Sequence, residues 1–185
     1  MTSHWLFQLM VLAVALFWLV GAYNRLMRLR NAVTKAWEQF EPALQKRSEA
    51  MAVVIEAMRT PLADEAGTLQ ALQDTDAKQR AAAAAATLAR ARVEEVSAWV
   101  AAEAALASPA SRLRALIDLH RPLGADGLPD PALAQALAAW AESEPRLAFL
   151  RQGFNDAAQV YNRALTQWPT RLLSTSFGFR LAGRA

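Results

Sequence analysis

The sequence predicts an all-α protein in which a single N-terminal transmembrane helix precedes an elongated antiparallel bundle of three long helices and one short helix. Three observations predict this fold class. Nineteen residues, 5 to 23, are apolar or aromatic apart from Gln8 and Gly21. Downstream, apolar residues recur at alternating intervals of three and four, the period of an amphipathic helix. Glycine is scarce and β-branched runs are missing, which argues against strands.

The first segment, residues 1–23, is expected to span a membrane. At about 1.5 Å of rise per residue, a helix over its apolar stretch covers about 28 Å, close to the hydrocarbon thickness of a bilayer. Trp5 and Tyr23 bracket this stretch as interfacial aromatic residues do. The alternative is a cleaved secretory signal with Val20 and Ala22 before the cleavage site, although a signal normally has a basic start and a shorter apolar core.

The charges that flank this stretch predict its orientation. No Lys or Arg precedes it, whereas Arg25, Arg28, Arg30 and Lys35 follow it. By the positive-inside rule, we expect the N-terminus outside and the C-terminal domain in the cytoplasm. The predicted location is therefore the cell inner membrane, with a single pass.

Residues 24–169 are expected to form the helical bundle domain. Its first helix continues from the membrane segment to about residue 59, and Pro42 should remove one hydrogen bond and bend it. The second helix is expected over roughly residues 68–106, where six consecutive alanines favour helix.

Proline and glycine residues set the remaining boundaries of the bundle. Ser108 and Pro109 resemble the N-cap and first turn of a short helix that ends near residue 120. The Pro- and Gly-containing stretch 121–129 is the longest expected loop. Asp130 and Pro131 then begin the last helix, which should run to Trp168, with a phase shift or kink where Pro145 interrupts the apolar stripe.

Arg47 and Glu144 each occupy a position where an apolar stripe would otherwise place a hydrophobic side chain. Burial of either charge alone costs several kcal/mol, which favours a shared site. In antiparallel helices, Arg47 would lie about 18 Å before the far end of the first helix and Glu144 about 21 Å after the start of the last. We therefore predict a structural ion pair that sets the helix register. The alternative is that one or both side chains reach solvent at the edge of the stripe.

Residues 170–185 form the expected C-terminal tail. An antiparallel last helix returns to the level of Arg25, and the tail mixes Leu and Phe with arginine, a composition suited to a membrane interface. The alternative is an ordinary segment that packs on the bundle or is disordered. The predicted membrane-interface residues are Trp5, Tyr23, Arg25, Arg28, Arg30, Phe177 and Phe179.

Two blocks of the sequence share a pattern with a known family. The first contains Tyr23-Asn24-Arg25-Leu26, Leu29-Arg30-Asn31, Ala36-Trp37 and Lys46-Arg47, and the second contains Phe154-Asn155-Asp156, Tyr161-Asn162, Trp168-Pro169 and Phe177-Gly178-Phe179. Together they resemble the LemA family of bacterial membrane-anchored proteins. This resemblance implies an N-terminus outside, a helical domain inside and no catalytic residue.

The asparagine residues of this resemblance form two pairs. Asn24 and Asn31 are seven residues apart, as are Asn155 and Asn162. Each pair would share one face of its helix and hydrogen-bond to another helix or cap groups near the membrane, with ligand recognition as the alternative.

Several kinds of chemistry are not expected. The chain has no cysteine, and its two histidines, His4 and His120, lie too far apart to form a metal site, so no cofactor is predicted. The 20 basic and 17 acidic residues alternate in sign, which does not favour nucleic-acid binding. No small-molecule substrate is evident, and we expect no enzymatic activity.

The remaining expectation is a membrane-anchored, non-enzymatic interaction or scaffold protein. Its expected partners are the lipid bilayer and unidentified proteins or other copies of the chain. The alternative is a sensory or signalling module, in which a helix continuous with the span transmits small shifts to the bundle.

Overall fold

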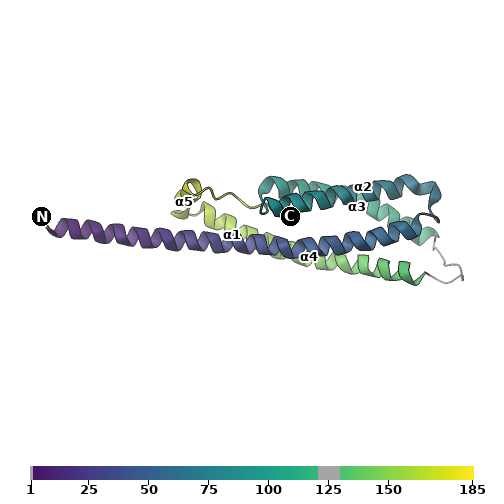
Figure 1. Cartoon of the computed structure of the whole chain (residues 1–185), viewed down its shortest axis with the longest axis horizontal. Helices are drawn as coiled ribbons and strands as arrows, with labels where there is room; N and C mark the ends of the chain where they lie inside the picture. The colour runs from purple at the N-terminus through teal and green to yellow at the C-terminus, as the bar shows by residue number, and fades with distance from the viewer. Residues whose placement is uncertain (1, 121–129) are drawn as a thin grey trace.

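The computed structural model describes residues 2–120 and 130–185, so the expected loop over 121–129 lies outside the described residues. In chain order its elements are α1 (Thr2–Met58), the 3-10 turn η1 (Ala63–Glu65), α2 (Ala66–Leu88), α3 (Val93–His120), α4 (Pro131–Thr166) and α5 (Thr170–Ser176). They form a long rod of packed helices with an N-terminal extension (Figure 1). The prediction of an all-α protein with one long apolar N-terminal helix is confirmed.

The longest element, α1, is a single helix of 57 residues. Its N-terminal part projects beyond the bundle (Figure 1), and its most apolar window has no buried residue. Among the described residues this is the one helix long and apolar enough to cross a membrane. Pro42 does not end the helix. Both Pro42 and Glu38, whose carbonyl group loses its amide partner, are exposed, so water can bind that carbonyl.

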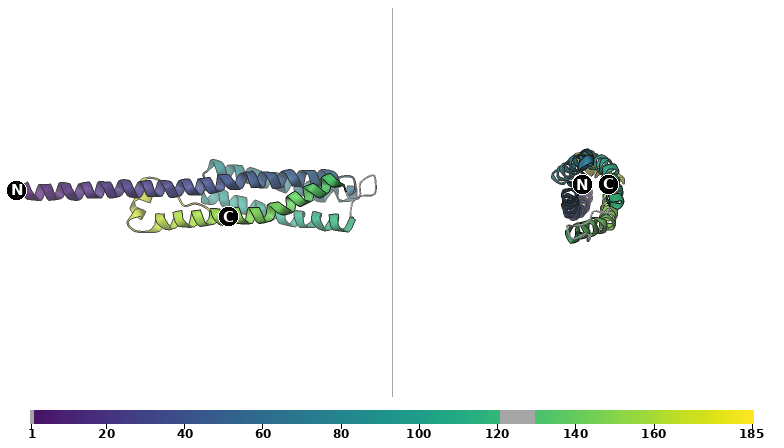
Figure 2. Two further views of the ribbon diagram at one scale, coloured as in Figure 1. Left: turned by 90° about the horizontal axis from the view of Figure 1, so that it is seen from below. Right: turned by 90° about the vertical axis from the view of Figure 1, so that its right-hand side faces the viewer.

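The four long helices form two antiparallel pairs. α1 packs along α4, and α2 packs along α3. α1 and α3 run away from the N-terminal extension, whereas α2 and α4 return toward it (Figures 1 and 2). The two pairs must therefore be joined by side chains that cross between them.

The chain between residues 66 and 120 is divided differently from the expectation. It turns back after Leu88, so the region expected as one helix over 68–106 belongs to α2 and α3, and Pro109 lies inside α3 rather than at the start of a short helix. The turn contains no glycine: Arg90 and Ala91 have φ angles of 54° and 55°, a left-handed conformation that such residues rarely adopt. The amide of Ala91 donates a hydrogen bond to the carbonyl of Ala86 and closes the end of α2. The bundle thus has four long helices.

The predicted start of the last helix is confirmed. The side chain of Asp130 accepts a hydrogen bond from the amide of Ala132 at 2.9 Å, and Pro131 occupies the first turn. α4 continues past Pro145 and curves along its length (Figure 2). It ends at Thr166, just before the expected end.

The segment after α4 is part of the folded bundle. Leu173, Phe179 and Ala182 are buried in the same apolar cluster as residues of α1, α3 and α4. The expected separate tail over 170–185 therefore packs on the bundle, and α5 lies at the end that faces the N-terminal extension (Figure 1).

The interior contains two apolar clusters along the rod. The cluster nearer the N-terminal extension is built around four aromatic side chains, Trp37, Phe40, Trp99 and Phe154, whose ring centroids lie 5.0–5.6 Å apart where they touch. The far cluster is aliphatic apart from Trp140 and contains Met51, Leu72 and Leu113. Burial of these apolar side chains is the main force that holds the pairs together.

Candidate functional site: a charged layer between two apolar clusters

A layer of polar side chains separates the two apolar clusters. Each long helix contributes to it at the level where one cluster gives way to the other. The buried members are Arg47 and Ser48 of α1, Asp76 and Gln79 of α2, and Ser143 of α4, and the half-buried Glu103 comes from α3. The packing of the two apolar clusters does not itself require polar residues from all four helices at this level, so the polar layer is a separate feature of the bundle.

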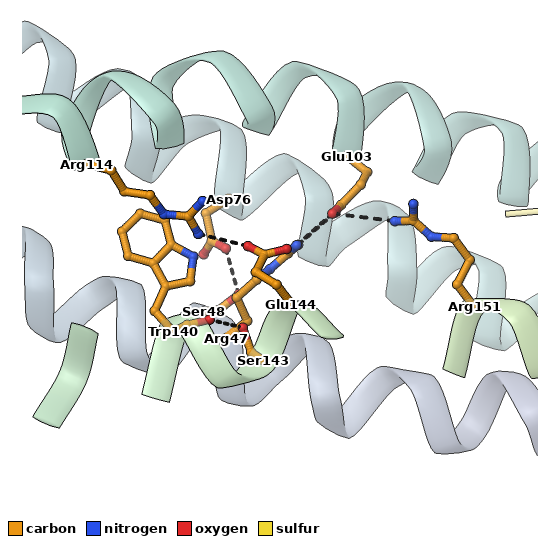
Figure 3. A network of polar contacts seen from close by, with 9 residues as sticks. All are labelled: Arg47, Ser48, Asp76, Glu103, Arg114, Trp140, Ser143, Glu144 and Arg151. Atoms are coloured by element: carbon orange, nitrogen blue, oxygen red, sulfur yellow. Dashed lines mark hydrogen bonds and ion pairs between the residues drawn. The ribbon is translucent and has the colours of Figure 1, made fainter. Parts of the chain in front are cut away.

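The centre of the layer is an ion pair between α1 and α3 (Figure 3). Arg47 donates two hydrogen bonds to Glu103, Nη1 to Oε1 at 2.6 Å and Nη2 to Oε2 at 2.7 Å. The Arg47 side chain is 4 % exposed and that of Glu103 18 %. Arg151 of α4 lies 3.7 Å from the same carboxylate. The two hydrogen bonds between Arg47 and Glu103 form the bidentate arrangement in which guanidinium and carboxylate bind most strongly.

The environment of Arg47 keeps its guanidinium charged. Burial by itself would lower the pKa of Arg47, because a charged group is less stable away from water. The hydrogen bonds and the negative charge of Glu103, with smaller contributions from Glu144 and Asp76, outweigh burial and raise the pKa above its ordinary value. Arg47 therefore keeps its positive charge throughout the physiological pH range.

The predicted direct pair between Arg47 and Glu144 is wrong. Glu144 instead accepts a hydrogen bond from Arg114 of α3 at 2.9 Å, and its side chain is 48 % exposed. Arg114 also stacks over the ring of Trp140, 4.2 Å from its centroid. The antiparallel register behind the prediction is nevertheless correct, because Arg47 and Glu144 line one cavity of about 170 Å³ between α1, α3 and α4.

A second polar contact of the layer joins α1 to α2. Ser48 Oγ donates to Asp76 Oδ1 at 2.6 Å, and Arg80 Nε donates to Asp76 Oδ2 at 2.9 Å (Figure 3 shows Ser48 and Asp76). A groove of about 360 Å³ runs beside this contact and is also lined by Glu41 and Glu49.

The contacts of the layer cross from one helix pair to the other. Arg47 with Glu103 connects α1 to α3, Ser48 with Asp76 connects α1 to α2, and Arg114 with Glu144 connects α3 to α4. Each contact requires its two side chains to lie at the same level along the rod. If one helix pair slid past the other, several of these contacts would break at once. The layer can therefore set the register between the pairs, a known role of buried polar groups.

The layer offers no grouping that is typical of a metal centre. Within residues 2–120 and 130–185, no three His, Cys, Asp or Glu side chains gather closely enough to hold a metal ion. His120 is at the far end of α3, where Nδ1 lies 2.9 Å from the carbonyl oxygen of Leu116.

Asn155 and Asn162 bind the C-terminal segment and not another helix. Asn162 donates to the carbonyl of Ala182 at 2.8 Å and accepts from its amide at 2.9 Å. Asn155 makes the same two contacts with Ala185, at 2.6 and 2.8 Å. The predicted interhelix role is thus wrong for this pair, which clamps an extended segment on α4. Asn24 and Asn31 are exposed on α1 and make no side-chain hydrogen bond within the described part of the chain.

Gly183 shows how closely this segment approaches the bundle. Its amide donates to the carbonyl of Ala91 in the α2–α3 turn at 3.0 Å. A Cβ atom at this position would collide with the side chain of Val96, so only glycine fits without a shift of the backbone.

We expect Asn162→Ala to release the C-terminal segment, because the amide and carbonyl of Ala182 lose their partners. Loss of a half-buried hydrogen-bonded pair should lower the free energy of unfolding by about 1–3 kcal/mol. Amide hydrogen exchange over residues 179–185 should become faster. The matched control is Asn31→Ala, which should leave both properties unchanged. Equal effects of the two substitutions would contradict the clamp.

The predicted membrane-interface residues divide into two groups. Trp5 and Phe177 are 67 % and 51 % exposed, and Arg25 and Arg28 are exposed, as an interface requires. Arg30 is half-buried. The half-buried ring of Tyr23 contacts those of Phe177 and Phe179, at 5.4 and 5.7 Å between centroids. Phe179, also predicted at the membrane interface, is only 8 % exposed and belongs to the apolar cluster, so its side chain packs inside the bundle and not on its surface.

Tyr161 is expected to make the stability of the bundle sensitive to alkaline pH. Its hydroxyl donates to the carbonyl of Arg180 at 3.0 Å. Burial raises the pKa of Tyr161 above its ordinary value of 10.0, and Arg30 opposes this rise only in part. The unfolded chain therefore loses the phenolic proton at a lower pH than the folded chain does, so stability is lost as pH rises above about 10.

We expect Tyr161→Phe to flatten this alkaline decline, although the variant loses one hydrogen bond at neutral pH. The measurement is denaturant unfolding of both proteins at several values between about pH 8 and 11. Parallel declines in the two proteins would show that Tyr161 does not contribute.

The sequence contains a signal for most residues that our prediction missed. Buried residues of α3 follow at 96, 99, 106 and 110, and the half-buried Glu103 occupies the stripe position between 99 and 106, so Glu103 is the charged member of an apolar stripe. In the same way, Asp76 and Gln79 are the polar members of the buried stripe of α2. The criterion that selected Arg47 selects these residues as well, once the break between α2 and α3 is known.

The fold and the site define a class of protein: an all-helical bundle tied together by an internal charged layer, with an apolar N-terminal helix compatible with a membrane anchor. A family model described as the LemA family matches residues 36–183, and the chain belongs to that family. The resemblance seen in the sequence is thus confirmed. No curated protein matches the chain.

Proposed function

We propose that this LemA-family protein is a non-enzymatic, membrane-anchored scaffold. In this proposal, α1 spans the inner membrane once with the N-terminus outside. The bundle then lies in the cytoplasm and binds proteins, or copies of itself, through its outer surface.

The observation that carries the proposal is the continuity of α1. The same helix contains the exposed apolar stretch and, from Leu26 onward, buried residues of the bundle. Such a helix would hold the bundle at a fixed distance from the bilayer. The basic residues Arg25 and Arg28, exposed just after the apolar stretch, favour the cytoplasmic side for the bundle.

The distribution of charged and apolar side chains supports a binding role for the outer surface of the bundle. Charged groups in the interior neutralise one another in the layer around Arg47 and Glu103. Large apolar side chains outside the apolar stretch are also exposed on the rod, with Phe149 on α4 at 75 %. Exposed aromatic residues of this kind are common at protein interfaces.

Protease treatment of intact cells tests the orientation. The bundle should stay intact until the inner membrane is permeabilised and should then be digested. Digestion after Tyr23 from outside intact cells would overturn the cytoplasmic location.

Site-specific photocrosslinking in native membranes tests the scaffold role. A photoreactive residue in place of Phe149 should yield adducts with other proteins or copies of the chain. The matched control replaces Phe17, which is 80 % exposed in the apolar stretch. Adducts at position 17 but none at position 149 would contradict a scaffold surface on the bundle.

A sensory or signalling module is the second candidate, and the unbroken helix from apolar stretch to bundle favours it. Insertion of two glycines after Tyr23 separates the two functions, because glycine weakens a helix. A scaffold should keep its adducts at position 149 after this insertion, whereas a sensor that depends on the continuous helix should lose or redistribute them.

A further inference from the structure

We propose that α5, together with Trp168 before it and Phe177 after it, forms a second contact with the bilayer, beside the transmembrane helix. The contact surface consists of Trp168, Leu172 and Phe177, hereafter the α5 patch. The proposed partner is the interfacial region of the lipid bilayer. This inference rests on the membrane anchor of the proposed function, but not on its scaffold role or its orientation.

The α5 patch is exposed although it is strongly apolar. Trp168, Leu172 and Phe177 are 81 %, 65 % and 51 % exposed. On the same segment Thr170 and Leu173 are buried against the bundle, which fixes the segment and turns the patch outward. Contiguous exposed apolar residues commonly mark a surface that is covered by a partner or a membrane.

The position of the α5 patch identifies that partner as lipid. Tyr23 ends the apolar stretch, and its ring lies 5.4 Å from the ring of Phe177 between centroids. If the stretch before Tyr23 fills the hydrocarbon core, Tyr23 lies at the interface, and Phe177 must lie at nearly the same depth. α5 and the turn before it are the part of the bundle closest to the N-terminal extension in both side views (Figures 1 and 2).

The chemistry of the α5 patch matches this depth. Tryptophan is enriched at membrane interfaces because it has an apolar ring and one polar N–H group. Short segments that carry Trp, Phe and Leu on one face lie in the plane of the interface. Arg25 and Arg28, exposed on α1 close to Tyr23, would contact the headgroups at the same level.

Depth-dependent fluorescence quenching of the full-length protein tests this contact. The natural chain has no cysteine, so Leu172→Cys accepts a single NBD fluorophore. The matched control is Leu119→Cys at the far end of α3, because Leu119 is also exposed, at 76 %. Phe17→Cys reports on the anchor itself. Each protein is reconstituted into phospholipid vesicles with and without lipids that carry a nitroxide just below the headgroup.

We expect the labels at positions 17 and 172 to lose emission to the nitroxide, and the label at position 119 to keep it. Trp168→Cys should behave like Leu172→Cys, and far-UV circular dichroism checks that all variants are folded. Quenching at 17 without quenching at 172 would overturn the lipid contact and leave the anchor intact. No quenching at 17 would overturn the anchor and this inference together.

A second copy of the chain is the competing partner for the α5 patch. A label at position 172 that is shielded from water but not quenched by the nitroxide, and that becomes exposed when the protein is diluted in excess lipid, would assign the patch to self-association. That result would also overturn the lipid contact.

Discussion

Arg47→Met is expected to lower the free energy of unfolding by about 2–4 kcal/mol, because it leaves the carboxylate of Glu103 without its main partner. The loss is set below that of a fully buried pair, since Glu103 keeps some access to water and the nearby Arg151 at 3.7 Å. The measurement is denaturant unfolding of the full-length protein in detergent, followed by far-UV circular dichroism.

Two further variants separate pairing from packing at this position. Arg59→Met removes an exposed partner of Glu56 on the same helix and should change stability by less than about 0.5 kcal/mol. The double variant Arg47→Leu with Glu103→Leu should recover most of the stability or exceed it, because neither charge then remains buried alone. An unchanged stability of Arg47→Met, or a double variant less stable than Arg47→Met, would contradict a pair that mainly sets register.

Trp37→Ala should cost about 3–5 kcal/mol, the range observed when a fully buried aromatic side chain is removed. The indole lies edge-on to Trp99 at 89° and contacts Phe40 and Phe154. Its Nε1 also donates to the hydroxyl of Thr87 at 2.9 Å, which ties α1 to α2. The substitution therefore opens a cavity and removes a link between the two helix pairs.

The matched control for this prediction is Trp168→Ala, which removes an exposed indole of the same size. In detergent it should change the free energy of unfolding by less than about 0.5 kcal/mol. Similar losses for the two tryptophans would show that the aromatic cluster is not the centre of the near half of the bundle.

The sequence contained enough information to predict the long helices with an apolar stripe, but not where α2 ends. Six alanines and their neighbours are good helix formers, and the turn at Arg90 and Ala91 contains neither glycine nor proline. Contacts made by Ala91 with the C-terminal segment stabilise this unusual turn. Pro109 led to the opposite error, since a helix boundary was expected there and none is present. A proline on a partly exposed face can be tolerated inside a long packed helix.

Of the charged layer, the sequence predicts one pair, Arg47 with Glu144, and not the layer itself. Arg47 was correctly identified as a buried charge, but Glu144 lies beside the stripe, and its neighbour Ser143 is the buried residue. With Ser143 in the stripe, the buried positions 133, 136, 140, 143 and 147 alternate regularly, so the expected phase shift disappears. The true partner, Glu103, lies on α3, and its proximity depends on how the two helix pairs pack. A single stripe does not contain that information.

Amide hydrogen exchange of the full-length protein in lipid nanodiscs tests whether α1 continues from its apolar stretch into the bundle without a break, as the structure shows. We expect the amides of residues 20–30 to exchange as slowly as those of residues 33–44 in the same helix. Complete exchange of residues 20–30 at the earliest time point, with residues 33–44 still protected, would instead show a flexible linker between the apolar stretch and the bundle.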